Sequence, residues 1–168
     1  MIMYLVGPRA SGKTSVGGQL AKALNIPFAD TDLALAAARG MPIAEVVAQE
    51  GWEGFRAHEC EALRNVSSPP RIVATGGGIV LDAANRRFMR EHGTVLYLSA
   101  PATVLAARLE AQPDHNSRPS LTGKSIALEV EDILKERDHL YRECAHHVVD
   151  AARETETIVR EIISLAGK

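Results

Sequence analysis

The chain begins MIMYLVGPRASGKT (residues 1–14), and this stretch decides the class of fold. The apolar run Ile2–Val6 is typical of a buried strand, and a loop framed by two glycines follows it directly. The loop fits the pattern G-x-x-x-x-G-K-[ST], whose backbone N–H groups surround phosphate oxygens, whose lysine adds a positive charge and whose hydroxyl can bind Mg²⁺. The residues of the pattern are Gly7, Gly12, Lys13 and Thr14. The stretch predicts a loop that binds phosphate.

The segment after the loop, TSVGGQLAKAL (residues 14–24), supports this interpretation. Val16, Leu20 and Leu24 recur at a spacing of one helical turn, so we expect a helix whose positive N-terminal end faces the bound phosphate. The alternative is a glycine-rich turn that binds nothing. Motif, position and context together favour a phosphate loop.

Composition sets limits on class and partners. A chain of 168 residues, 46% hydrophobic and 24% charged, is ordinary for one globular domain. A net charge of −2 gives no reason to expect nucleic acid as a partner, and no apolar stretch reaches the length of a membrane span. Cys60 and Cys144 have no metal-binding spacing, and we expect free thiols in a reducing cytoplasm. We also expect a monomer without a signal peptide.

Short apolar segments alternate with longer helical patterns, which indicates a parallel sheet covered by helices on both faces. Predicted strands cover Ile2–Val6, Ile26–Asp30, Arg71–Thr75, Thr94–Leu98 and His146–Val149. Predicted helices cover Thr14–Leu24, Asp82–Glu91, Pro101–Glu110, Ser125–Arg142 and Thr155–Ala166. Two segments depart from this rhythm. Residues 31–66 show helical patterns without a strand, and residues 111–124 show no periodicity, which is typical of a functional loop.

The segment FADTDL places two carboxylates at the carboxyl end of the second predicted strand. In an extended stretch Asp30 and Asp32 would point the same way, toward the edge where open α/β sheets bind ligands. One carboxylate could lie near Mg²⁺ and the other could contact a substrate hydroxyl. The alternative is that Thr31 or Asp32 only caps the following helix.

The segment IVATGGGIV ends the next predicted strand with three consecutive glycines. A bare turn needs fewer, so we expect the backbone to approach a ligand here. Two arginines also fit poorly as surface charges. Arg56 is placed to pair with Glu59 one turn later, and Arg137 follows an apolar stripe on its helix. Each could bind a carboxylate or phosphate, or extend its charged end to solvent. Arg118, in the aperiodic segment, could reach a phosphoryl group during transfer.

Taken together, GPRASGKT, FADTD, GFRAHE, ATGGG, RPSLTGK and ERDHLYRECA resemble the shikimate kinases, in order and with the spacing of that family. The resemblance implies a single kinase domain over residues 1–168. It implies a P-loop fold of the nucleoside-monophosphate-kinase type, with three α/β/α layers and a five-stranded parallel sheet in the order 2-3-1-4-5. It also implies a substrate-binding helical insertion over about 31–61 and a lid over about 111–124.

The resemblance also implies roles for individual residues. Asp32 would bind the shikimate hydroxyl and act as the base, while Lys13 and Arg118 would stabilise the phosphoryl group. The remaining shikimate-binding positions would be Arg56, Gly77, Gly78 and Arg137. Thr14 and Asp30 would hold Mg²⁺. ATP would be bound by Gly7, Gly12, Lys13, Thr14, Ser15, Arg108, Arg118 and Arg153, with Arg108 stacked on the adenine and residues 151–155 on its other face.

One residue departs from the family pattern. Ala10 stands where shikimate kinases usually have glycine, so either the backbone has a negative φ there or it carries some strain. The expected activity is transfer of the γ-phosphoryl group of ATP to the 3-hydroxyl of shikimate. The alternatives are a kinase for gluconate or nucleoside monophosphates, which would not explain GFRAHE together with TGGG, and a non-catalytic nucleotide-binding module.

Overall fold

The computed structural model of the chain describes residues 1–112 and 125–167. Its strands form one parallel sheet in the order β2-β3-β1-β4-β5, which confirms the predicted fold class and strand order. The strands are β1 (Ile2–Val6), β2 (Phe28–Asp30), β3 (Arg71–Ala74), β4 (Thr94–Ser99) and β5 (His147–Asp150).

Helices connect successive strands, as parallel pairing requires. They are α1 (Lys13–Leu24), α2 (Thr31–Arg39), α3 (Ile43–Val66), α4 (Ala83–His92), α5 (Ala102–Ala111), α6 (Ile126–Cys144) and α7 (Thr155–Ala166), with a short 3₁₀ turn, η1 (Ile79–Leu81). The predicted strand at Ile26 begins only at Phe28. The reason is local: Asn25 is left-handed, and the N–H of Ile26 bonds to Ala21 at the end of α1.

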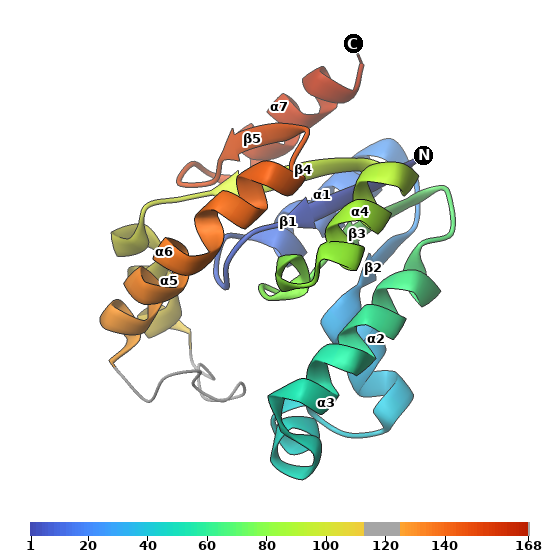
Figure 1. Cartoon of the computed structure of the whole chain (residues 1–168). Helices are drawn as coiled ribbons and strands as arrows, with labels where there is room; N and C mark the ends of the chain where they lie inside the picture. Colours follow the sequence, from blue (N-terminus) through green and yellow to red (C-terminus); the bar gives the residue numbers. More distant parts are fainter. Residues whose placement is uncertain (113–124, 168) are drawn as a thin grey trace.

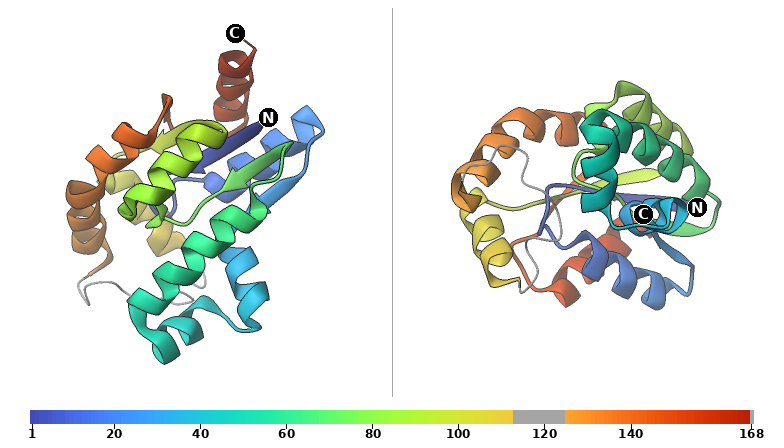
Figure 2. Two further views of the ribbon diagram at one scale, coloured as in Figure 1. Left: turned by 45° about the vertical axis from the view of Figure 1, so that its right-hand side comes forward. Right: turned by 90° about the horizontal axis from the view of Figure 1, so that it is seen from below.

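The sheet is buried on both faces because alternate residues of its central strand enter different cores. Met3 and Leu5 of β1 pack with α1, α5 and α7, while Tyr4 and Val6 pack with α3, α4 and α6. Figure 1 and the right view of Figure 2 together show helices on both sides of the strands. Two cores on one sheet hold the strand ends rigidly, and the strand ends carry the site described below.

The predicted helical insertion consists of α2 and the longer helix α3, which follow β2 without an intervening strand. Gly51 interrupts α3 with a φ of 72°, which splits the helix at a kink. The pair has a small core of its own, built on Leu35, Val46 and Phe55. It lies at the opposite end of the molecule from the C-terminus of α7 (Figure 1 and the left view of Figure 2).

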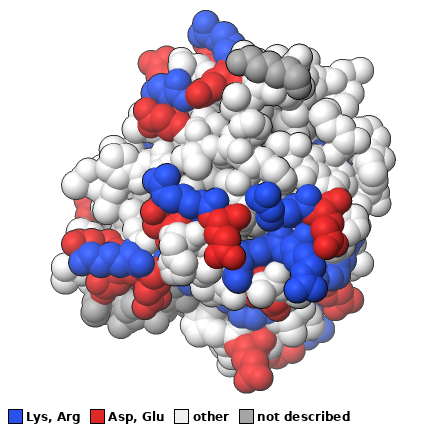
Figure 3. All heavy atoms as spheres, turned by 45° about the horizontal axis from the view of Figure 1, so that its top comes forward, with Lys and Arg blue, Asp and Glu red and all other residues white. Residues whose placement is uncertain are grey.

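The surface shows charges of both signs. On the face seen in Figure 3, groups of basic side chains have acidic side chains next to them. Across residues 1–112 and 125–167, no helix is both long enough and apolar enough to cross a membrane.

Candidate active site

The loop between β1 and α1 has backbone conformations that favour glycine at two positions. Gly7 has a φ of 149°, and a Cβ added there would lie 2.8 Å from the carbonyl oxygen of Leu98. Gly12 has a φ of 98° and is the residue before the first turn of α1. The N-terminus of a 12-residue helix therefore opens directly onto the loop. Unpaired N–H groups and the helix dipole make such an end an anion site.

Of the two alternatives given above for Ala10, a negative φ or a strained backbone, the second holds, because its φ is 67°. The loop thus keeps a left-handed residue where shikimate kinases usually have glycine, at a cost of roughly 1–2 kcal/mol for an L-residue. Arg108 of α5 braces this conformation. Its guanidinium donates to the carbonyl of Ala10 at 3.0 Å and to that of Ala151 at 2.7 Å, which joins the loop to the segment before α7.

Lys13 is nearly buried, with 9% of its surface exposed. Its ammonium group donates to the carbonyl oxygens of Gly7 and Pro8, the latter at 3.0 Å. A lysine held in this way places its ammonium group at the mouth of the loop, in a region of low dielectric constant where charge acts strongly.

Thr14 and Asp30 meet across the loop, although they are 16 residues apart. The Thr14 hydroxyl donates to Oδ2 of Asp30 at 3.0 Å, and the other carboxylate oxygen caps α2 by accepting from the N–H groups of Asp32 and Leu33. Neighbouring hydroxyl and carboxylate oxygens are the hard donors that Mg²⁺ prefers, with waters and phosphates as its other ligands. The pair fits the predicted metal position.

The expectation that Asp30 and Asp32 share one extended stretch is wrong, since α2 begins at Thr31. Asp30 also takes the capping role that the sequence offered to Thr31 or Asp32. The two carboxylates nevertheless line the same cleft, because the first turn of α2 brings Asp32 round to the loop. Helix geometry, rather than strand alternation, produces the convergence.

The cleft in front of the loop has a volume of about 530 Å³. Its walls include Arg9, Lys13, Thr14, Ser15, Asp30, Asp32 and Gly77. A second cavity of about 470 Å³ shares the loop segment 10–12 and Ser15 with it and continues toward α7. Arg108 lines this second cavity together with Ala151 and residues 153–155, where the base of a nucleotide was predicted.

Arg56 and Glu59 of α3 form the predicted ion pair, with Nη1 and Oε1 3.0 Å apart. The Glu59 side chain is 2% exposed, and burial raises the pKa of its carboxyl although the guanidinium groups of Arg56 and Arg137 act against this. A buried carboxylate of this kind holds an arginine in place and offsets its charge.

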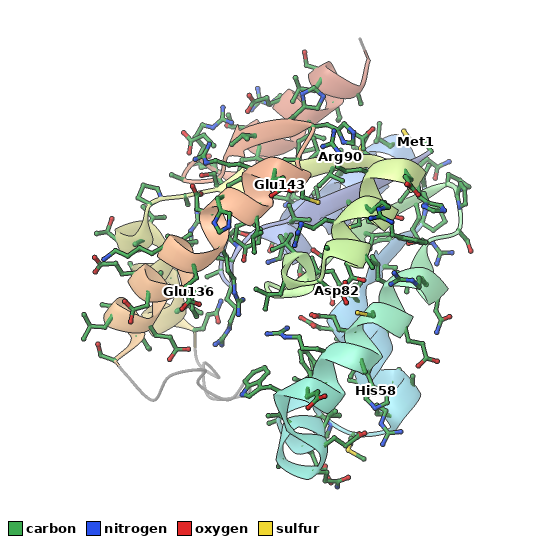
Figure 4. The ribbon with its side chains drawn as sticks, viewed as in Figure 1. Met1, His58, Asp82, Arg90, Glu136 and Glu143 are labelled. Carbon is green, nitrogen blue, oxygen red and sulfur yellow. The ribbon has the colours of Figure 1, made fainter. Side chains whose placement is uncertain are left out.

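Arg137 of α6 is buried, as its position on an apolar stripe predicted. The triple-glycine segment lies between the two arginines. A Cβ on Gly77 would lie 3.9 Å from Nη1 of Arg137, and a Cβ on Gly78 would overlap the guanidinium of Arg56. Figure 4 labels His58 and Glu136, which mark the two helices that carry these arginines, and side chains of both helices extend into the region between them.

Two residues to which the sequence analysis gave no contact with the triple-glycine segment hold that segment in place. The hydroxyl oxygen of Thr31 accepts from the N–H of Gly76 at 3.0 Å, and the hydroxyl of Tyr141 donates to the carbonyl of Gly77 at 2.6 Å. Both side chains are 0% exposed. The available signals were slight: Thr31 stands between two candidate carboxylates, and Tyr141 follows Arg137 by one helical turn.

Arg118 and the predicted lid from residue 113 onward lie outside the described residues. At the near end of that segment, Ala111 closes α5 and Gln112 lines both cavities.

Comparison with known proteins gives a consistent result. The family described as Shikimate kinase matches residues 9–166. The chain is 54% identical over 166 residues to the Shikimate kinase 2 of Syntrophotalea carbinolica, an alignment that covers 99% of this chain and 96% of that one. It is 55% identical over 162 residues to the Shikimate kinase 2 of an Enterobacter species, covering 96% and 93%.

A solved structure agrees with the sequence relatives. The shikimate kinase of Acinetobacter baumannii in complex with shikimate superposes with a TM-score of 0.91 at 34% identity, covering 98% of this chain and 92% of that chain. Family match, sequence identity and fold agree over nearly the whole length. The chain belongs to the shikimate kinase family.

Proposed function

We propose that this protein transfers the γ-phosphoryl group of ATP to the 3-hydroxyl of shikimate, giving shikimate 3-phosphate and ADP on the route to chorismate and the aromatic amino acids. One observation carries the proposal beyond family membership. The phosphate loop opens into the same cleft as Asp32 and Gly77, with two arginines behind the glycine segment. A phosphate donor and an acceptor molecule that carries a carboxylate can therefore meet there.

The free thiols of Cys60 and Cys144 support action in the cytoplasm, where we expect a monomer.

On the donor side, the loop amides and Lys13 bind the β- and γ-phosphates, and the second cavity takes the adenosine between Arg108 and Arg153. Thr14 and Asp30 would hold Mg²⁺, which when bound neutralises charge on the phosphate oxygens. Release of Lys13 from the loop carbonyls would let its ammonium group follow the transferred phosphoryl group. Positioning and charge neutralisation are the main demands of phosphoryl transfer.

On the acceptor side, Arg56 and Arg137 bind the carboxylate of shikimate and so fix the direction of its ring. Asp32 accepts the hydrogen bond of the 3-hydroxyl and takes its proton as the oxygen attacks the γ-phosphorus. The bond from phosphorus to the bridging oxygen breaks, and that oxygen leaves with ADP. The insertion 31–61 supplies most of these contacts, and we assign the segment 111–124 and Arg118 to a lid by resemblance alone.

The test is ADP release by a coupled assay with shikimate, gluconate and AMP offered separately to the purified protein. Turnover with shikimate alone is the expected result, and it should be abolished by chelation of Mg²⁺. Preference for gluconate or AMP, or turnover with none of the acceptors, would overturn the proposal. In a parallel arm, Asp32→Asn should lose kcat while it still binds ATP. A change confined to the shikimate KM would make Asp32 a binding group rather than the base.

A further inference from the structure

The carbonyl of Gly77 has an unusual partner for a loop at a ligand cleft. It accepts from the phenol of Tyr141 at 2.6 Å, across 64 positions of sequence and out of contact with solvent. A buried hydroxyl without a partner would be costly, and so would a buried carbonyl. The contact therefore satisfies both groups at once and fixes the Gly77 carbonyl toward α6.

The ring of Tyr141 is itself held firmly. It stacks on Tyr97 of β4, with ring centroids 4.9 Å apart and planes 29° apart, and the Tyr97 hydroxyl donates to Asp138 of α6 at 2.7 Å. Burial raises the pKa of Tyr141 to about 12, although Arg137 acts in the opposite direction. The phenol stays protonated at neutral pH and remains a donor.

The direction of this carbonyl has a consequence for the next amide. Because the peptide unit is planar and trans, the C=O of Gly77 and the N–H of Gly78 point in opposite directions. Among residues 1–112 and 125–167, none accepts a hydrogen bond from the amide of Gly77 or Gly78. Both donors are available to a ligand, and the hydroxyl of Tyr141 determines the direction of the Gly78 amide, which shares its peptide plane with the Gly77 carbonyl.

The same helix that carries Tyr141 carries Arg137, four residues earlier and on the same face. A Cβ on Gly77 would lie 3.9 Å from the Arg137 guanidinium. One hydrogen bond thus ties the Gly77–Gly78 peptide to the helix that carries Arg137, which is predicted to bind the shikimate carboxylate.

We propose that the buried hydroxyl of Tyr141 is a positioning group for the acceptor substrate, which holds the Gly77–Gly78 peptide in register with Arg137. This inference rests on the proposed function, since it assumes that shikimate occupies the cleft. Tyr141 does not touch the reacting atoms. Its effect is on acceptor binding, with little effect on the nucleotide.

The decisive variant is Tyr141→Phe, which removes one oxygen and leaves the stacked ring. Loss of one buried hydrogen bond should raise the shikimate KM about five- to tenfold. The ATP KM and kcat should stay within about twofold. Binding without nucleotide should weaken by the same factor as the KM, measured from the emission of Trp52, whose ring centroid lies 5.4 Å from the Arg56 guanidinium carbon.

Tyr97→Phe is the matched control, because it removes the other hydroxyl of the same stack. It should leave the shikimate KM unchanged. Equal increases in both variants would show a packing effect and overturn the inference, as would an unchanged shikimate KM in Tyr141→Phe. No turnover of shikimate by the unmutated protein would instead overturn the proposed function, so the two failures are distinguishable.

A measurement on the unsubstituted residue guards against misfolding of the variant. Tyrosine labelled with ¹³C at Cζ gives a resonance for Tyr141 that Tyr97→Phe and Tyr4→Phe assign by elimination. Shikimate alone should shift this resonance, because ligand binding to the glycine amides changes the hydrogen bond at Gly77. An unshifted resonance at saturating shikimate would contradict the proposal.

Discussion

The half of the cleft that binds the phosphoryl donor and the half that binds the acceptor use different chemical groups. The donor half is mainly backbone: a loop with left-handed residues, the first turn of α1 and the carbonyl contacts of Arg108. The acceptor half is mainly charged side chains from separate helices, with Arg56 on α3 and Arg137 on α6. Glu59 and two hydroxyls hold these parts in place.

This difference follows from the ligands. Phosphates present many oxygens that successive amides of one short loop can bind, so a local sequence suffices. A small carboxylic acid needs two or three charges at defined distances, and only the folded chain brings those together. The comparison predicts that substitutions in the donor half act on catalysis or loop conformation, and that those in the acceptor half act on shikimate binding.

The largest effect is expected where the donor half does depend on a side chain. Lys13→Met should lower kcat by about 10²-fold or more, because a charge that stabilises the transition state is removed. The fold should persist, because the ammonium group donates to carbonyls of its own loop rather than to a distant part of the core. Steady-state kinetics and thermal melting measure the two effects.

Lys22→Met is the control for this variant, because Lys22 is an exposed lysine on the same helix. It should leave kcat unchanged. Near-normal turnover of Lys13→Met would make the donor half a purely backbone site.

A second prediction concerns backbone in the acceptor half. Gly78→Ala should raise the shikimate KM by about tenfold or more, because the new methyl group would occupy the position of the Arg56 guanidinium and displace a charge-assisted contact. The KM for ATP should remain unchanged. Gly18→Ala, where an added Cβ meets nothing within 4 Å, serves as the control. A rise in both Michaelis constants would break the division between the halves.

Sequence alone predicted contacts between near neighbours better than contacts between distant segments. The phosphate loop is a contiguous motif, and the Arg56–Glu59 pair lies within one helical turn, so both could be predicted locally. The contacts of Thr31 with Gly76 and of Tyr141 with Gly77 span 45 and 64 positions. Their partners are backbone groups, and nearly every residue has the same backbone groups, so the residue type does not indicate such a contact. The position of the Asp32 carboxylate relative to that of Asp30 could not be predicted from the sequence either, because it depends on the residue at which α2 begins.

A third, smaller effect concerns pH and stability. Burial raises the pKa of Glu59 above its ordinary value of 4.5. The folded state therefore binds more protons than the unfolded state between the two pKa values, and the free energy of unfolding falls as pH rises through that window. Glu59→Gln cannot ionise. Its stability relative to the unmutated protein should increase between about pH 5 and about pH 8.

Denaturant unfolding at both pH values measures this difference. Glu61→Gln, at an exposed position on the same helix, should show no such trend. A constant difference for Glu59→Gln would mean that its ion pair with Arg56 fully offsets the cost of burial.

The smallest effect is expected at Ala10. Ala10→Gly removes the cost of a left-handed L-residue and should raise the free energy of unfolding by up to about 1 kcal/mol, less what the more flexible unfolded chain and the lost methyl contact take back. Asn25→Gly is the control, since Asn25 has a φ of 55° and asparagine tolerates this conformation. Destabilisation by Ala10→Gly would show that methyl packing outweighs backbone strain.

The bracing of Ala10 by Arg108 bears on how phosphate-loop proteins are identified. What the loop needs at this place is a dihedral angle, and an arginine bonded to the carbonyl of the same residue can hold that angle where glycine would adopt it freely. The general phosphate-loop pattern leaves this position open, but a shikimate kinase pattern that required glycine there would reject this chain although Ala10 keeps the left-handed angle. In this chain the angle depends on a pair of residues, a small residue in the loop and an arginine 98 positions later whose guanidinium donates to its carbonyl.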